Sequence, residues 1–277
     1  MTVTSLTIEP LTPGIGAEIP NLDLSEQLTD SVMKELEQAL LDWKVLFFRD
    51  QTIDVEDQKR VARWFGELDI HPTSAPGAEH AELIRIAEDE KLRAHNDIWH
   101  SDVTFKASPP MGSILRALEM PPVGGDTMFA DMYAAYEGLD DEIKVKIDNA
   151  TALHVWPPGW VDIVMKWQNM DRKEFDHRFP NPEHPVVRTH PQTGRRSLFV
   201  NAAFTRQIIG MEKSESDELL TFLYIQATVP EYQCRFRWRK NSVAFWDNRC
   251  TQHYALADFY PQKRTVERIT ICGDKPV

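Results

Sequence analysis

Residues 243–272 read VAFWDNRCTQHYALADFYPQKRTVERITIC and contain three short segments that are rich in β-branched and aromatic residues. The segments are Val243 to Trp246, Thr251 to Ala255 and Thr265 to Cys272, and polar residues with Pro261 separate them. Each segment therefore predicts a strand. Many short strands beside a few helices predict a mainly β chain with peripheral helices, built as a barrel-like antiparallel sandwich such as a jelly roll.

The rest of the chain fits this pattern. Proline and glycine pairs divide residues 97–131 into a β meander. Its expected strands are Trp99 to Phe105, Ser113 to Leu118 and Thr127 to Ala130. Apolar residues at helical spacing predict helices after Thr29 or Asp30, after Thr52 to Asp54, from Met132 to Ile147 and from Ser214 to about Ala227. Residues 157–184 have no clear period, so we expect an ordered lid or active-site insertion within one domain, residues 1–277.

Composition excludes several classes of protein. The 277 residues carry a net charge of −12, which argues against a nucleic-acid partner because binding to phosphates depends on Lys and Arg. There is no run of about 18 apolar residues and no secretory signal, so we expect a cytoplasmic protein without a membrane partner. The three cysteines lack CxxC spacing, which makes a disulfide framework or a cysteine zinc cluster improbable.

Two His-x-Asp pairs could contribute metal ligands. In the segment WHSDVTF, residues 99–105, a strand would place His100 and Asp102 on one face. With His253 they would form the two-His, one-carboxylate set of non-haem Fe(II) oxygenases. His95 and Asp97 have the same spacing, and spacing alone does not separate the two pairs. The apolar neighbours of His100 and Asp102 favour that pair, because they make a buried site plausible.

Several ordered motifs carry a family resemblance. They include NDIWHSDVTF (96–105), GGDT (124–127) and WDNR (246–249), followed by His253, Arg264 and Arg268. This series closely resembles the taurine dioxygenase family of Fe(II)/α-ketoglutarate enzymes, and the likeness runs from about Gly14 to Pro276. It implies a double-stranded β-helix (jelly roll, cupin-like). It also implies a catalytic iron held by His100, Asp102 and His253, with α-ketoglutarate (2-oxoglutarate) and O2 as co-substrates.

The resemblance also assigns binding roles. Thr127 and Arg264 would bind the distal carboxylate of α-ketoglutarate, a role that suits the planar fork of a guanidinium. If their segment is extended, Arg268 lies on the same strand face as Arg264. The residues that the resemblance places around the prime substrate are His71, Asn96, the backbone at Val103, Trp156, Phe204 and Arg268. Trp156 and Ser74 depart from the family pattern, which has Phe and Tyr there.

The implied activity is oxidative decarboxylation of α-ketoglutarate to succinate and CO2, coupled to hydroxylation of a small anionic substrate. Taurine or a related alkyl sulfonate would then release sulfite and an aldehyde. One alternative is the same chemistry on an alkyl sulfate or on a carboxylate-bearing natural product, by hydroxylation or desaturation. An alternative of a different class is a non-catalytic barrel that binds a small acid. Oligomers are common in the resembled family, so a homo-oligomer is compatible with this interpretation.

Overall fold

A seven-stranded sheet forms the centre of the computed structural model, which describes residues 5–71, 74, 77–93 and 96–277. Its strands, in spatial order, are β1 (Glu9–Pro10), β2 (Ala17–Glu18), β3 (Val45–Phe48), β13 (Val243–Asp247), β5 (Gly112–Glu119), β15 (Arg264–Ile271) and β4 (Leu83–Glu88). Only the β2–β3 pair is parallel among these strands. The expected strands near residues 243, 251 and 265 are all present as β13, β14 and β15.

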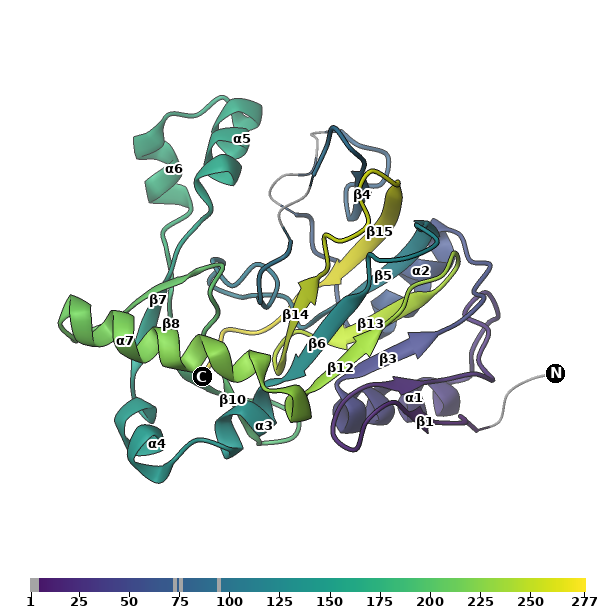
Figure 1. Ribbon diagram of the computed structural model, residues 1–277. Coiled ribbons are helices and arrows are strands. Elements are labelled where there is room, and N and C mark those ends of the chain that lie inside the picture. Colours follow the sequence, from purple (N-terminus) through teal and green to yellow (C-terminus); the bar gives the residue numbers. More distant parts are fainter. Residues whose placement is uncertain (1–4, 72–73, 75–76, 94–95) are drawn as a thin grey trace.

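Three smaller sheets complete the β structure. They are β12 (Gln233–Phe236), β6 (Thr127–Asp131) and β14 (Thr251–Ala255); β11 (Thr205–Ile208), β7 (Thr151–His154) and β8 (Glu183–Pro185); and β10 (Arg196–Leu198) with β9 (Val187–Thr189). Strands β9 and β10 form a hairpin around His190 to Gly194. The prediction of a mainly β chain with peripheral helices is confirmed (Figure 1).

Strand β3 shows how the layers pack. Its sequence, VLFF, is buried throughout because both faces of the sheet are covered. Phe48 faces the first and second helices, α1 (Asp30–Trp43) and α2 (Val55–Phe65), within one hydrophobic cluster. Phe47 faces the opposite way and stacks on Phe236 of β12, with ring centroids 4.0 Å apart. The alternation of side chains along one strand thus joins a helix layer to a second sheet.

The first two helices begin where the sequence predicts. Thr29 caps α1 by accepting a hydrogen bond from the backbone N–H of Val32. Asp54 and Asp57 form a reciprocal capping box at the start of α2. Both caps satisfy N–H groups that have no partner within the helix, so the local sequence is sufficient to set these boundaries.

The single helix expected from Met132 to Ile147 is wrong, because the structure has two helices, α3 (Met132–Glu137) and α4 (Asp141–Ile147). The Tyr232 hydroxyl lies where a Cβ on Gly138 would be, so only glycine fits between the two helices. Glycine is a poor residue for helix continuation, and Asp140 adopts an extended backbone before α4. The break between α3 and α4 therefore coincides with a contact between Gly138 and Tyr232, which are 94 residues apart in the sequence.

The strand expected from Trp99 to Phe105 is also wrong. His100 forms one isolated bridge with His253, and residues 102–105 then turn. Val103 lies in the left-handed region, with φ at 55°. The Asn248 side chain accepts a hydrogen bond from the Asp102 N–H at 2.6 Å and donates to the Asp102 carbonyl at 3.0 Å. These two hydrogen bonds replace those that a neighbouring strand would make to the Asp102 backbone. A residue 146 positions away along the chain therefore stabilises the turn.

Residues 157–184, for which no secondary structure was expected, contain two helices. These are α5 (Pro158–Gln168) and α6 (Arg172–Arg178), and they project together beyond the sheets (Figure 1). Helix α7 (Lys213–Tyr224) continues into short 3-10 turns at Ile225–Thr228 and Pro230–Tyr232, close to the expected helix. In the part of the chain that the structure describes, no helix is long and apolar enough to cross a membrane.

Candidate active site

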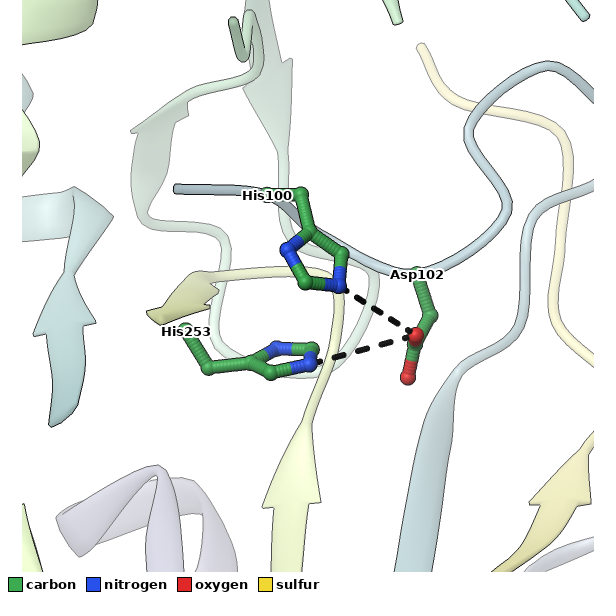
Figure 2. A group of neighbouring side chains, drawn as sticks. All are labelled: His100, Asp102 and His253. Carbon is green, nitrogen blue, oxygen red and sulfur yellow. Dashed lines mark ion pairs between the residues drawn. The ribbon is translucent and has the colours of Figure 1, made fainter. Parts of the chain in front are cut away.

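Three potential metal ligands converge on one another, His253 from β14 and His100 and Asp102 from the segment that precedes β5 (Figure 2). His100 and His253 are joined by two backbone hydrogen bonds of 3.1 and 2.8 Å. Their Nε2 atoms lie 3.9 and 4.0 Å from the same oxygen, Oδ1 of Asp102. All three side chains are buried. The backbone pairing therefore brings the His253 imidazole next to His100 and Asp102, which precede it by 153 and 151 residues.

The imidazoles are in the form that binds metal. The Nδ1 atom of His100 lies 2.7 Å from the Ile98 carbonyl, which can only accept a hydrogen bond. Nδ1 therefore carries the proton, and the lone pair of Nε2 points toward Asp102. Burial lowers the pKa of His253 to about 3 and also lowers that of His100. Both rings are thus neutral at pH 7 and can donate a nitrogen lone pair.

Asp102 is held as an anion. Burial alone would raise its pKa, but the Arg268 guanidinium outweighs that effect and keeps the pKa well below its usual value. Arg268 Nη1 donates to Oδ1 at 2.6 Å, and Ser113 Oγ donates to Oδ2 at 3.1 Å. A buried carboxylate that is ionised, oriented and next to two neutral imidazoles is a suitable ligand set for a divalent transition metal.

A second group of potential ligands, His190, Asp247 and Cys250, does not suit a metal. His190 Nε2 donates to Asp247 at 3.0 Å, while its Nδ1 accepts from the N–H groups of Gln192 and Thr193. Both ring nitrogens are therefore used. Arg249 donates from Nε and Nη2 to the two Asp247 oxygens at 2.9 and 2.6 Å. This group is a neutralised hydrogen-bond network, and its role is to hold the start of the β13–β14 turn.

A cavity of about 470 Å³ opens onto the first group. Its described lining residues are His71, Ile84, Ile86, Asn96, Ile98, His100, Asp102, Leu115, Thr127, Phe129, Pro157, Trp160, Ile163, Ala203, Phe204, Trp246, His253, Ala255, Arg264, Val266 and Arg268. Most are apolar, and Asp102 is the only carboxylate among them. The cavity therefore combines a mainly apolar lining with a few polar and charged side chains, which is typical of a small-molecule site.

Two arginines of β15 face this cavity. Arg264 and Arg268 are four residues apart, so the alternation of the strand places both on one face. Both are nearly fully buried, with 4% and 9% of their surface exposed. Arg264 Nη1 donates to Glu88 at 3.0 Å. Thr127 also lines the cavity, and its Oγ1 accepts a hydrogen bond from the Trp238 indole at 2.9 Å.

The remaining residues expected around the substrate fall into two groups. His71, Asn96 and Phe204 line the cavity with Arg268. Burial and the nearby Arg268 lower the pKa of His71 to about 3, so His71 is neutral. Val103 and Trp156 are not among the described lining residues. Trp156 packs behind the wall against Phe105, with ring centroids 4.2 Å apart.

Some residues that the sequence pointed to lie outside the cavity, and two others line it unexpectedly. Ser74 is half-buried and is not a described lining residue, and Asp97 is exposed. His95 lies outside the described residues. Trp160 and Ile163 of α5 line the cavity, although the sequence analysis did not assign them to the site. Their spacing of three residues after a Pro-Pro-Gly turn was the signal that could have identified a helix with one face toward the site.

Comparisons with known proteins agree with this geometry. The model of the family described as Taurine catabolism dioxygenase TauD, TfdA family matches residues 7–270. An alkylsulfatase of Acinetobacter baylyi is 38% identical over 97% of this chain and 86% of its own length. An alpha-ketoglutarate-dependent sulfate ester dioxygenase of Pseudomonas putida is 36% identical over 98% and 91%.

Solved structures show the same likeness. A taurine dioxygenase from Burkholderia xenovorans superposes with a TM-score of 0.84 at 36% identity, covering 99% of this chain and 93% of that one. The structure of AAD-2 in complex with Mn(II) and N-oxalylglycine gives a TM-score of 0.82 at 30% identity, with 99% of both chains covered. The likeness thus extends over nearly the whole chain.

Proposed function

This chain belongs to the TauD/TfdA family of dioxygenases, as its motifs predict, and from that premise we propose an Fe(II)- and α-ketoglutarate-dependent enzyme that oxidises an alkyl sulfate ester or alkyl sulfonate. One observation carries the proposal. Two buried guanidinium groups, Arg264 and Arg268, face one cavity that also contains His100, Asp102 and His253. A site with two inward cations beside a metal-ligand set can take two organic anions at once.

His100, Asp102 and His253 would hold the iron. Their donor set fits Fe(II), since the rings are neutral, the carboxylate is ionised and the ligand atoms lie within 4.8 Å of one another. Bound iron, with α-ketoglutarate, supplies the O2 activation and the oxidation of a C–H bond, and the protein supplies binding and orientation. Family membership makes a catalyst the better interpretation than a barrel that only binds a small acid.

Arg264 and Thr127 would bind the distal carboxylate of α-ketoglutarate. The indole N–H of Trp238 can only donate, so the Thr127 oxygen accepts that bond and its hydroxyl proton can be donated to a ligand. Arg264, which also lines the cavity, offers a planar set of donors. Together they present three or more N–H and O–H donors to one carboxylate.

Arg268 would bind the sulfate or sulfonate of the prime substrate, with His71 and Asn96 beside it. In the structure its charge is balanced by Asp102, through the 2.6 Å contact of Nη1 with Oδ1. A metal cation bound to Asp102 would compete with Arg268 for Oδ1. The Arg268 guanidinium would then be available to pair with the anionic group of the substrate. Metal and substrate binding should therefore support each other.

The walls favour an alkyl chain over the ammonium group of taurine. Ile84, Ile98, Trp160, Ile163 and Phe204 offer apolar surface. Because Asp102 is the only carboxylate among the described lining residues, no other acid there can pair with an ammonium group. An alkyl sulfate or a longer alkyl sulfonate thus fits the cavity better than taurine does, and a carboxylate-bearing substrate stays a further alternative.

We also propose the finer architecture that the resemblance implies. The packing of the β12–β6–β14 sheet against the seven-stranded sheet supports a double-stranded β-helix, with the site at one end of the sandwich. Pro157 and two residues of α5, Trp160 and Ile163, line the cavity, which supports the proposal that residues 157–184 act as its lid. The family match over residues 7–270 supports one catalytic domain.

A substrate panel tests the proposed function. The protein is loaded with Fe(II) anaerobically and given α-ketoglutarate and O2 with hexyl sulfate, hexanesulfonate, taurine or hexanoate. We expect succinate formation coupled to release of sulfate from the ester or sulfite from the sulfonate, with hexyl sulfate and hexanesulfonate ahead of taurine. Arg268→Ala should lower kcat/KM by about a hundredfold or more, because a substrate anion loses its buried partner. Succinate formation that is independent of every anion would contradict the proposal, and preference for taurine would contradict the apolar-chain argument.

A further inference from the structure

Glu88 is a buried carboxylate that the proposed chemistry does not use. It is the last residue of β4 and shares a strand face with Ile84 and Ile86, which line the cavity. In the register of β4 with β15, Glu88 lies directly opposite Arg264. Glu88 is 7% exposed and is not among the described lining residues, whereas Arg264, to which it is hydrogen-bonded, lines the cavity.

The contacts of Glu88 divide between its two oxygens. Arg264 Nη1 donates to Oε2 at 3.0 Å, and the Tyr260 hydroxyl donates to Oε1 at 3.2 Å. The Tyr260 ring is in turn covered by the Arg93 guanidinium, 4.5 Å from its centroid. Tyr260 therefore orients the Glu88 carboxylate independently of its contact with Arg264.

This arrangement decides which edge of Arg264 a ligand can use. A guanidinium binds a carboxylate bidentately through either of two edges, Nη1 with Nη2 or Nε with Nη2. Because Nη1 is bonded to Glu88, the first edge is partly occupied, whereas Nε and Nη2 still form a complete fork. Burial also lowers the pKa of Arg264, and Glu88 acts against that decrease, which keeps the guanidinium charged.

We propose that Glu88 is a positioning residue for α-ketoglutarate, which holds Arg264 by Nη1 so that Nε and Nη2 meet the distal carboxylate of the co-substrate. The inference rests on the proposed function. Glu88 should therefore affect only the binding of the distal carboxylate of α-ketoglutarate. Binding of the keto acid end, which would lie at the metal, should not depend on this residue.

Three variants separate orientation from simple structural support. Glu88→Ala removes both acceptors, whereas Glu88→Gln keeps one carbonyl oxygen in nearly the same volume. Glu90→Gln is the matched control, because Glu90 is an exposed carboxylate two residues away. Each protein is loaded with Fe(II) under argon and titrated with α-ketoglutarate, and separately with pyruvate, which lacks the distal carboxylate. The charge-transfer absorption band reports binding, and iron stoichiometry and thermal unfolding are measured in parallel.

We expect Glu88→Ala to weaken the binding of α-ketoglutarate by about tenfold or more, as for the loss of a charge-assisted hydrogen bond. The affinity for pyruvate should not change. Glu88→Gln should bind α-ketoglutarate within about threefold of the wild type, and Glu90→Gln should equal it. Equal weakening of both keto acids, a Gln variant as weak as the Ala variant, or no effect at all would overturn the inference. A wild-type protein that forms no absorption band with α-ketoglutarate would instead overturn the proposed function.

Discussion

At the scale of single residues, the site depends on the protonation states of three buried groups. His100 and His253 are neutral because burial disfavours the imidazolium form, and Asp102 is ionised because a guanidinium outweighs burial. These opposite outcomes arise within 4.0 Å of one another. A metal ion therefore needs to displace few protons at neutral pH, and no ligand has to move far.

The first prediction concerns these ligands. His100→Ala, Asp102→Ala and His253→Ala should each lower bound iron from about one ion per chain to a small fraction, because a three-ligand site with one ligand missing binds Fe(II) weakly. Asp97→Ala should retain the iron, because Asp97 is exposed and outside this group. Iron stoichiometry after anaerobic reconstitution measures the effect. Loss of iron in the Asp97 variant with retention in the Asp102 variant would assign the ligands to the other His-x-Asp pair.

The second prediction concerns Asp247 and pH. Burial alone would raise the pKa of Asp247, but Arg249 and His190 outweigh it and hold the folded-state pKa below its ordinary value of 3.8. The ionised group therefore stabilises the fold above that value, and the stabilisation is lost as the pH falls below it. Asp247→Asn should cost about 3 to 5 kcal/mol at pH 7, because Arg249 stays buried without its counter-charge.

Urea unfolding of the two proteins from pH 7 down to pH 3 measures this effect. The difference in unfolding free energy should begin to narrow at the acid end, where the Asp247 carboxyl takes up a proton in the unfolded wild-type chain but stays ionised in the folded one. Asp176→Asn is the control, because its pairing with Arg172 is exposed and should be worth less than about 1 kcal/mol. A difference that stays constant over the whole pH range would show that the Asp247 charge is not what stabilises this network.

At the scale of elements, a rigid strand and a peripheral helix contribute different parts of the site. Strand β15 is paired on both sides, with β4 and β5, and it presents the two arginines that would bind the anionic groups. Helix α5 packs in one hydrophobic cluster with Phe175 of α6 and with Phe105, Trp156 and Phe204, and it presents Trp160 and Ile163 to the cavity. The anionic groups would thus be recognised by β15 within the sheet. The carbon chain of the substrate would be recognised by α5, a peripheral element whose sequence can vary.

The third prediction follows from the two faces of α5. Trp160 lines the cavity and meets His71 edge to face, with centroids 5.0 Å apart. Trp167, on the same helix, is 42% exposed and is not a described lining residue. Trp160→Ala should lower kcat/KM for longer alkyl sulfates relative to the shortest ones by about tenfold or more, since pocket contacts of this size discriminate by about 1 to 3 kcal/mol.

The matched variant Trp167→Ala should leave the same ratio unchanged, and neither variant should alter α-ketoglutarate binding. Initial rates over a series of primary alkyl sulfates, from short to medium chain, give the ratios directly. Equal effects of the two variants would show that α5 acts through its own folding and not through the cavity wall.

At the scale of the whole molecule, the three cysteines report how completely the chain is folded. Cys234 and Cys250 are buried in different regions, and Cys272 is exposed at the end of β15. Burial raises the pKa of Cys234 to about 12 and raises that of Cys250 as well. Because the thiolate is the reactive form, both buried thiols should be inert until the protein opens.

The fourth prediction is that a chromogenic disulfide at pH 8 labels one thiol per chain in the folded protein and all three after denaturation. Cys272→Ser should abolish the early labelling without affecting the other two thiols. Labelling kinetics followed by mass spectrometry check both statements. Early labelling of Cys234, which packs between the two sheets, would show that this core opens under native conditions.

Local sequence alone determined much of this protein. Caps at Thr29 and Asp54, and the β-branched and aromatic residues of β13, β14 and β15, act through neighbouring residues, so those elements could be predicted. The family motifs, each a short string with a distinctive order, predicted site residues that mostly line the cavity, whereas Val103 and Trp156 are not among its described lining residues.

Other features were decided only by contacts between distant parts of the chain. Asn248 holds the turn at Asp102, so the two ligands His100 and Asp102 converge without the strand that their spacing predicted. Tyr232 meets Gly138 where one helix becomes two. Glu88 reaches Arg264 through the register of β4 and β15. Trp156 and Trp160 lie close together in sequence, yet only the packing of α5 decides that Trp160 faces the cavity, because periodicity shows which residues share a face but not what that face meets.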